Sequence, residues 1–208
     1  MSALVRFAPI TGVIAVGLLV IAAIVGGEPL DVDASGDEVI SFYTDNEGAQ
    51  FGSAALGAYG ALFLIFFVST LRSVLRRAED AAGSPGIAST IAFGGGLLMA
   101  FGLLAFSGFA FTLADASDVL EPAAAQALNA LNADFFFPVA GGVAALLIGS
   151  AISILRTGVL PAWLGWLAAA IGVLAVTPLG FFAFLLSGLW ILIASVVLFT
   201  SSPFESRQ

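Results

Sequence analysis

The chain contains no cysteine, no histidine and no lysine, and these absences exclude several kinds of chemistry. Without thiolate or imidazole ligands, haem, copper, iron–sulfur and typical zinc sites cannot form, so that only an all-oxygen metal site remains. Without lysine there is no Schiff base to retinal or pyridoxal phosphate, and neither a serine–histidine pair nor a cysteine nucleophile can be assembled. We therefore expect no cofactor, no metal and no catalytic residues, and an enzyme is the less favoured class.

Charged residues are also scarce. They make up 10% of the 208 residues, whereas 60% are hydrophobic and the mean hydropathy is +1.11. A water-soluble domain carries roughly 25% charged residues. The composition therefore predicts an integral membrane protein.

Six apolar segments are long enough to cross a hydrocarbon core of about 30 Å as helices that rise about 1.5 Å per residue. They lie at about 8–26, 52–71, 87–112, 136–155, 163–178 and 180–200. Thr177, Pro178 and Gly180 separate the last two segments and predict a tight turn between them. The expected fold is all-α: a single domain, residues 1–208, that forms a bundle of six transmembrane helices.

The first segment has a second interpretation, because it follows Arg6 as the apolar core of a secretory signal would. The run is long and lacks an Ala-x-Ala cleavage pattern, which favours a retained helix.

Each arginine lies next to a segment end, and because successive spans run in opposite directions, all six arginines fall on the same side of the membrane. They are Arg6, Arg72, Arg76, Arg77, Arg156 and Arg207. Because short cytoplasmic loops are enriched in basic residues, this pattern predicts a multi-pass protein of the cell membrane with both termini in the cytoplasm.

Eleven of the fourteen acidic residues fall on the other, outer side, in the segments 27–51 and 113–135. Such an acidic face is either a solvated surface or a means of concentrating cations and cationic ligands. The sequence has no basic cluster, and we expect no nucleic-acid partner.

The two outer segments carry helix signals of their own. Ser35 and Glu38 have the spacing of a capping box and predict a short helix before the second span. In the second outer segment, Pro122 suits the first position of a helix. One face of that helix, over residues 120–133, would hold apolar side chains, with Gln126 and Asn129 opposite. The apolar set is Leu120, Ala124, Leu128, Leu131 and Phe135. The sequence thus predicts short amphipathic helices on the outer face.

The interiors of the spans contain no acidic or basic residue, which disfavours a pump, a proton-coupled transporter or a voltage sensor. Pro138 and the run Gly94–Gly96 leave a pore lined by backbone or hydroxyl groups as an alternative. Trp163 and Trp166 are expected at the cytoplasmic interface as an aromatic belt.

A candidate ligand-binding site follows from the depth of the polar side chains. Tyr59, Ser107, Thr177 and Ser187 all fall in the outer third of their spans, with Trp190 about one turn deeper. If the four hydroxyls converge, they give an apolar cavity a few polar contacts and Trp190 forms its floor, as in a lipid or small-molecule site. Alternatively each serine or threonine bonds its own helix, Tyr59 points outward, and Trp190 is a packed structural residue.

Three stretches resemble a family of uncharacterised bacterial membrane proteins, often actinobacterial, that is known only as a domain of unknown function. They are Leu160–Leu167, followed by Gly188–Leu192, and Val39–Tyr43, which leads through Asn46 into the second span and on to Arg72. The resemblance implies a six-helix integral membrane protein. It supplies no activity, substrate or functional residue.

Three classes of function are compatible with these features. The favoured one is a non-enzymatic membrane protein that binds a membrane lipid or small apolar ligand in its outer half, or that serves as a partner subunit or homo-oligomer. The second is a small-molecule transporter or channel, which needs a continuous polar track across the membrane. The third is an enzyme that uses outer carboxylates such as Asp115 and Asp134, which must then face one cleft.

Overall fold

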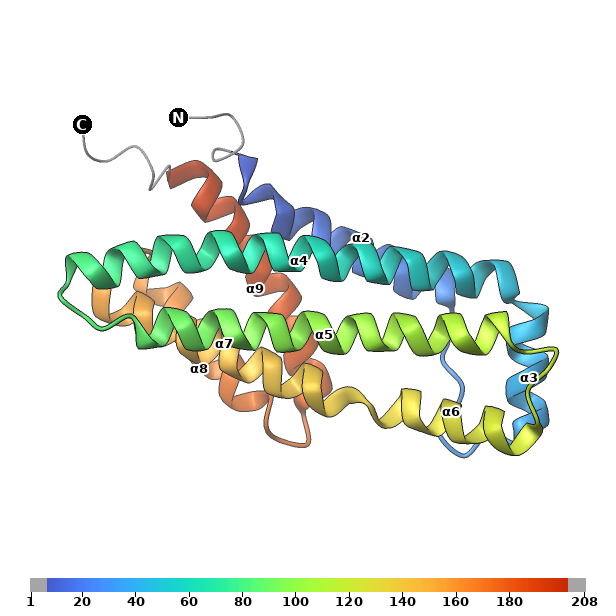
Figure 1. The fold of residues 1–208 in the computed structure, drawn as a ribbon. Helices are drawn as coiled ribbons and strands as arrows, with labels where there is room; N and C mark the ends of the chain where they lie inside the picture. The colour runs from blue at the N-terminus through green and yellow to red at the C-terminus, as the bar shows by residue number, and fades with distance from the viewer. Residues whose placement is uncertain (1–6, 202–208) are drawn as a thin grey trace.

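The computed structural model describes residues 7–201, and helices are the only regular secondary structure in that range. The all-α prediction is therefore confirmed. The helices are α2 (Ile10–Gly26), α3 (Gly36–Asp45), α4 (Glu47–Ala81), α5 (Ile87–Asp115), α6 (Pro122–Asp134), α7 (Phe136–Thr157), α8 (Ala162–Leu174) and α9 (Gly180–Ser201). Figure 1 shows α4 and α5 side by side along the length of the molecule.

Four helical stretches are long and apolar enough to cross a membrane, judged by length and composition. They are α4, α5, the stretch Pro122–Thr157 that contains α6 and α7, and Gly180–Thr200 in α9. The helices α2 and α8 are apolar but shorter, with 17 and 13 residues. The sequence predicts six full-length spans, whereas the structure has four helical stretches of that length and two shorter apolar helices.

The ends of α4 and α8 differ most from the predicted segments, and both differences have local causes. α4 has 35 residues, because it continues past its apolar part in both directions, from Glu47 at its start to a charged stretch near its end in which Arg72, Arg77 and Asp80 are exposed and Glu79 is buried. α8 stops at Leu174. There the Thr177 hydroxyl donates to the Leu174 carbonyl oxygen and accepts from the Leu179 N–H, which closes the predicted turn around Pro178.

A break at Phe135 separates α6 from α7. Pro138 explains it, because proline has no N–H to donate to the carbonyl four residues earlier and its ring collides with that carbonyl. The carbonyl in question belongs to Asp134, the last residue of α6. The chain therefore changes direction here, as Figure 1 shows between the two helices.

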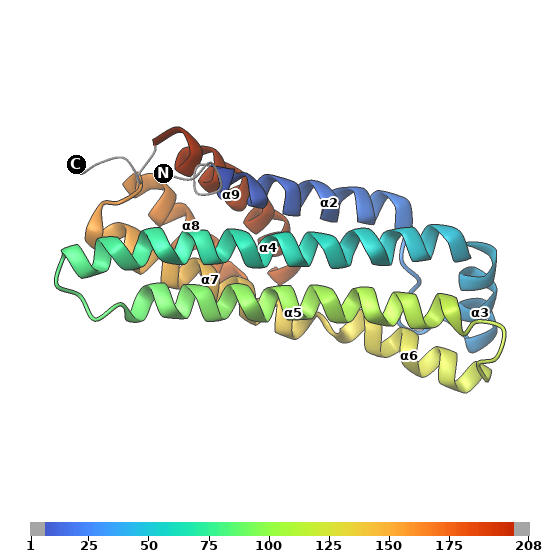
Figure 2. The ribbon, with the colours of Figure 1, turned by 45° about the horizontal axis from the view of Figure 1, so that its top comes forward.

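The core lies where α4, α5 and α7 pack together, with α2 against α4 and α8 against α7 (Figures 1 and 2). The backbones of α5 and α7 approach each other closely in this core. A Cβ atom at Gly142 would lie 2.7 Å from Met99 Cα, and one at Gly149 would lie 2.5 Å from the Ala92 nitrogen. Glycine is required at both positions because the two backbones touch, a common way of packing membrane helices.

α9 crosses the other helices obliquely and meets α2 at only one end. The rings of Phe7 and Phe199 are 6.2 Å apart there, and Gly12 makes room for the Ser195 side chain. From this contact the two helices diverge toward Gly26 and Gly180. Their divergence creates the space described below.

The helices α3 and α6 pack against each other at the end of the molecule opposite the α4–α5 turn. We call this end the capped end and the other the turn end. A second small core holds the cap together and consists of Val39, Tyr43, Leu113, Ala114 and Ala125. Burial raises the pKa of the Tyr43 phenol, because the charged form loses its hydration.

The predicted capping box at the start of α3 is confirmed. The Ser35 N–H and hydroxyl both donate to the Glu38 carboxylate at 2.8 Å, and the Glu38 N–H donates back to the Ser35 hydroxyl. The hydrogen bonds from Ser35 lower the pKa of Glu38, since they stabilise its charged form.

The prediction of a helix over 120–133 is confirmed, and Leu120 and Leu128 of its apolar face pack against the small core, but Asn129, expected on the opposite face, is buried. Ala125 and Asn129 are the residues of α6 that are buried, whereas Leu131 is 45% exposed and Leu128 is only half-buried. The Asn129 amide donates to the Asp31 carbonyl oxygen at 2.9 Å. The prediction failed because an asparagine can turn inward when a loop carbonyl needs a donor, which hydrophobic periodicity does not register.

We expect Asn129→Ala to loosen the cap, because the mutation removes the donor of the Asp31 carbonyl and leaves a gap beside Ala125. The loss should be about 1–2 kcal/mol of unfolding free energy. Thermal unfolding in detergent measures it, and Gln126→Ala on the exposed side of α6 is the matched control. Equal melting temperatures for the two variants would contradict the role given to Asn129.

Candidate functional site

A cavity of about 590 Å³ lies between the diverging helices α2 and α9. Its size falls in the range of about 300–1,000 Å³ that is usual for small-molecule sites. Four of its lining residues are more than half exposed and form its rim: Val20 on α2, and Phe181, Leu185 and Leu189 on α9. The cavity therefore opens sideways between these two helices.

The floor of the cavity comes from α4 and α5. Ala54, Leu64, Met99 and Leu103 are all buried and line it, together with Ile191 of α9. The lining residues of α4 lie in its first half, and those of α5 extend from Met99, near its middle, toward its C-terminal end. Because these helices are antiparallel, both sets belong to the half of the molecule nearer the capped end.

The walls of the cavity are almost entirely hydrocarbon and aromatic, and no acidic or basic residue lines it. Three side chains bring polar atoms: Ser53, Ser107 and Asn132. The Ser53 hydroxyl donates to the Ala22 carbonyl oxygen at 2.9 Å, and the Ser107 hydroxyl donates to the Leu103 carbonyl oxygen at 3.1 Å. The Asn132 side-chain oxygen, Oδ1, is buried and has no hydrogen-bond partner.

An unpaired buried oxygen is uncommon, since a buried acceptor without a partner costs about 1–3 kcal/mol. Asn132 stands near the end of α6, one turn before the break caused by Pro138. The break thus delivers a polar side chain from the cap to the wall of an apolar cavity. This combination makes the cavity the candidate functional site.

Toward the turn end the core is closed by large side chains. Phe67, Leu71, Leu146, Leu147 and Ile154 are each less than 2% exposed. Of the buried serines outside the cavity, Ser195 lies near Phe67, and neither it nor Ser150 nor Ser153 lines the cavity. The cavity is consequently a one-sided pocket.

The structure does not bring the five sequence-predicted site residues together. Ser107 lines the cavity. Tyr59 is 58% exposed on the outside of α4, and Thr177 is exposed in the turn after α8. Ser187 is fully buried and donates to the Phe184 carbonyl oxygen, so its neighbour Gly188 lines the cavity in its place. A common centre for the four hydroxyls is therefore not found.

Trp190 is a packed structural residue. It is completely buried, and its indole N–H donates to the Leu164 carbonyl oxygen of α8 at 3.0 Å. This bond satisfies the donor that the sequence places in the apolar part of the bundle. The cavity floor, expected at Trp190, is formed on α9 by Ile191 instead.

Depth in the membrane can be read from the sequence, but the direction of a side chain around its helix cannot. Adjacent positions of a helix point about 100° apart, which is why Gly188 lines the cavity and Ser187 does not.

The sequence did not indicate two other lining residues, Asn132 and Ser53, for different reasons. Asn132 belongs to the polar face of a helix expected to meet water, and Ser53 stands near the start of a span, where serine is common. Neither position carries a signal for a cavity.

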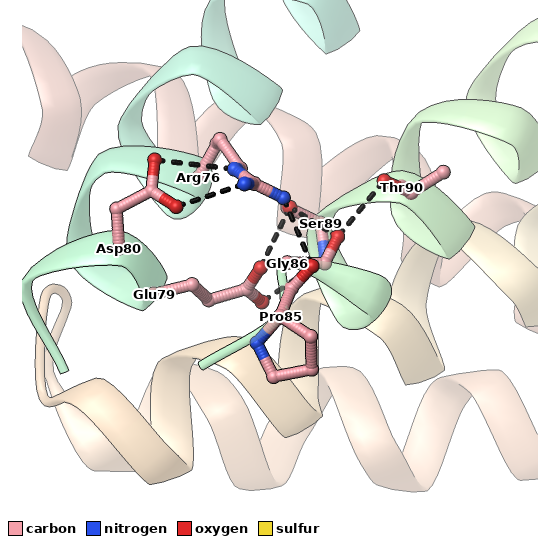
Figure 3. A network of polar contacts seen from close by, with 7 residues as sticks. All are labelled: Arg76, Glu79, Asp80, Pro85, Gly86, Ser89 and Thr90. Carbon is pink, nitrogen blue, oxygen red and sulfur yellow. Dashed lines mark hydrogen bonds and ion pairs between the residues drawn. The ribbon is translucent and has the colours of Figure 1, made fainter. Parts of the chain in front are cut away.

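A second polar cluster lies at the α4–α5 turn (Figure 3). The Glu79 carboxylate is 2% exposed and accepts from the Ser89 N–H at 3.0 Å and the Ser89 hydroxyl at 2.7 Å. Arg76 pairs with Asp80 at 2.9 Å and donates to the Pro85 carbonyl oxygen. The Glu79 carboxylate satisfies the Ser89 N–H in the first turn of α5, and the Arg76 bonds fix the turn, so the cluster has a structural role.

The outer carboxylates considered for catalysis lie at the surface. Asp115 and Asp134, the pair singled out in the sequence, are both exposed, as ordinary solvated acids are. Among residues 7–201 there is no group of three or more acidic side chains that would hold a metal ion. The arrangement gives no support to acid–base chemistry by this pair.

Comparison of the sequence with protein-family models and curated proteins, and of the fold with solved structures, gives no match. The resemblance to a family of uncharacterised bacterial membrane proteins therefore stays a prediction. What the structure defines is a class: an all-α protein with four helical stretches that can span a membrane and a sideways-opening apolar cavity.

Proposed function

We propose that this protein is a six-span protein of the cell membrane that binds a lipid-like molecule in the cavity between α2 and α9. The observation that carries the proposal is the opening of an apolar cavity through an exposed rim on two apolar helices. In a membrane this rim faces the acyl chains, so a lipid can enter sideways without passing through water. Membrane lipid is accordingly the proposed partner.

The positions of charged residues along the bundle support this placement. Arg72, Arg76 and Arg77 in α4 and Arg156 in the last turn of α7 all lie toward the turn end, whereas α3, α6 and the acidic segments around them lie at the capped end. Arg6 and Arg207 lie outside the described residues. We assign the turn end to the cytoplasm by the positive-inside rule.

The helices α2 and α8 can serve as the two additional spans. At about 1.5 Å per residue, 17 residues of α2 extend about 25 Å, close to the thickness of the hydrocarbon core. α8 is shorter, but Trp163 and Trp166 at its start are 53% and 67% exposed, as expected of indoles at an interface. The turn around Pro178 would then lie within the outer part of the membrane region, where the Thr177 hydroxyl pairs with the Leu174 carbonyl oxygen and the Leu179 N–H.

The topology has a direct test, because the native chain has no cysteine. Asp33→Cys places a thiol at the capped end and Ala82→Cys places one in the turn, both at exposed positions. In intact cells, an impermeant maleimide should label the first variant and not the second, and membrane disruption should make both reactive. The reverse pattern would overturn the orientation.

The binding proposal is tested by filling the cavity. A side chain at Gly188 meets only Val16, at 3.8 Å from the added Cβ, so that Gly188→Leu projects into the cavity without a backbone clash. Gly17→Leu is the control, since Gly17 on α2 has nothing within 4 Å of its Cβ and does not line the cavity. Native mass spectrometry of the purified protein should show retained lipid for the native chain and Gly17→Leu. Retention should fall at least several-fold for Gly188→Leu.

Retention that is equal in all three proteins would contradict binding in this cavity, and no retained lipid in the native chain would contradict the function itself. The closed layer around Phe67 and Leu147 disfavours a transporter or channel, which needs a polar track through that region. A role as a partner subunit is compatible with lipid binding, but the cavity supports only the binding of a lipid.

A further inference from the structure

Resting on the proposed function, the shape and the lining of the cavity also point to the part of the lipid that it holds. We propose that the cavity takes up a hydrocarbon chain of a lipid from the leaflet at the capped end, and that the head group of this lipid stays outside the cavity. Recognition then depends on the chain and not on the head group.

The cavity is long in the direction of the bundle. Its lining residues on α4 extend from Ser53 to Leu64 and those on α5 from Met99 to Ala110, in each helix eleven steps of about 1.5 Å, or about 16 Å. The hydrocarbon core of a membrane is about 30 Å thick, so that one leaflet contributes about 15 Å. The length of the cavity therefore matches the hydrocarbon part of one leaflet.

The cavity leads inward from the capped end. Ser53 and Ala110 lie toward that end, whereas Leu64 and Met99 lie near the middle of their helices and are fully buried. Beyond them the core is closed by large buried side chains such as Phe67. A chain that enters from the leaflet at the capped end therefore brings its methyl end to Leu64 and Met99.

The opening of the cavity suits the entry of a chain. Its rim is apolar and exposed, and consists of Val20 on α2 and Phe181, Leu185 and Leu189 on α9. A chain can pass from the leaflet between these two helices while the rest of the lipid stays among its neighbours. Inside, the chain supplies the van der Waals contacts that the walls of an empty cavity lack.

The lining gives a head group little reason to enter. No acidic or basic side chain lines the cavity, so a phosphate, carboxylate or ammonium group would lose its hydration without gaining a counter-charge. The Ser53 and Ser107 hydroxyls already donate to the carbonyl oxygens of Ala22 and Leu103. A polar head group is therefore more stable at the membrane surface than in the cavity.

Phosphatidylcholine probes with a photoactivatable diazirine test where each part of the lipid lies. The diazirine is placed in the head group, near the carbonyl end of one chain or near its methyl end, and the full-length protein is reconstituted in vesicles that contain one probe at a time. After illumination, tandem mass spectrometry of peptic peptides locates the labelled residues. The methyl-end probe should label Leu64 and Met99, which lipid around the bundle does not reach because they are at most 1% exposed.

The other two probes should give different patterns. The carbonyl-end probe should label Ser53 and Ala110 in preference to Leu64 and Met99, and the head-group probe should label none of these four residues. Phe66 on the outside of α4 is 60% exposed and does not line the cavity, so it reports labelling by the surrounding lipid.

Variants and a second head group complete the test. Gly188→Leu should lower the labelling of Leu64 and Met99 by the methyl-end probe at least several-fold and leave that of Phe66 unchanged, whereas Gly17→Leu should keep the native pattern. A phosphatidylglycerol probe with the same methyl-end diazirine should label Leu64 and Met99 as strongly as the phosphatidylcholine probe. Circular dichroism melting curves show whether each variant is folded, and the comparison of probes on the native chain does not depend on any variant.

The outcomes separate this inference from the proposed function. Labelling of Leu64 and Met99 by the head-group probe, or a strong preference for one of the two head groups, overturns recognition by the chain and leaves lipid binding intact. Stronger labelling of these two residues by the carbonyl-end probe than by the methyl-end probe overturns the assignment of the leaflet. If no probe labels them although lipid retention depends on Gly188, the chain inference alone is wrong; if no lipid is retained either, both proposals are wrong.

Discussion

Trp190→Ala is expected to lower the free energy of unfolding by about 3 kcal/mol, among the largest effects of any single substitution in this protein. Trp190 is fully buried, and its indole fixes α9 to α8 through the bond to the Leu164 carbonyl oxygen. Removing the indole leaves a void that rigid neighbouring helices cannot close. Because the surroundings are apolar before and after folding, lost packing contributes more than transfer from water, which favours the lower end of the range for soluble proteins.

Two further substitutions separate packing from hydrogen bonding at this position. Trp190→Phe keeps most of the aromatic volume and removes the N–H donor, so we expect a loss of about 1 kcal/mol. Trp166→Ala, at a position that is 67% exposed, should cost much less than Trp190→Ala. Unfolding by SDS titration in mixed micelles measures all three. Similar losses for Trp190→Ala and Trp166→Ala would contradict the packed role of Trp190.

Gly142→Ala should destabilise the protein by at least about 1–3 kcal/mol, the usual cost of overpacking. The added methyl group would meet the Met99 backbone nitrogen, with Met99 Cα at 2.7 Å and the Gly95 carbonyl oxygen at 2.8 Å. Backbone atoms cannot move aside as a flexible side chain can. The methyl group must therefore separate α5 from α7, the pair of helices at the centre of the core.

Gly141→Ala is a matched control in the same helix. The nearest atom to its added methyl group is Leu98 Cδ2 at 3.8 Å, an ordinary contact. Since alanine is a better helix former than glycine, this control should be neutral or more stable by up to about 1 kcal/mol. Thermal unfolding in the same detergent compares the two. A melting temperature for Gly142→Ala equal to that of Gly141→Ala would show that α5 and α7 are less closely packed than described.

The sequence determined the features that depend on local composition. Apolar runs gave an all-α fold with helix ends that are mostly within a few residues of those expected, Ser35 and Glu38 gave the capping box, and Pro178 gave the turn before α9. Each of these follows from interactions between residues close in the chain. The segregation of arginine likewise needs only the order of the segments, and it leads to the proposed orientation.

Tertiary structure alone decided the cavity, the inward turn of Asn129 and the placement of Trp190 against α8. All three depend on the rotation of a helix about its axis and on the angle at which it crosses its neighbours. In the apolar spans those quantities leave little trace in the sequence, because the side facing lipid and the side facing protein are both hydrophobic. The close contact of α2 and α9 at one end, and their divergence at the other, is the product of such packing and places Asn132 beside an apolar space.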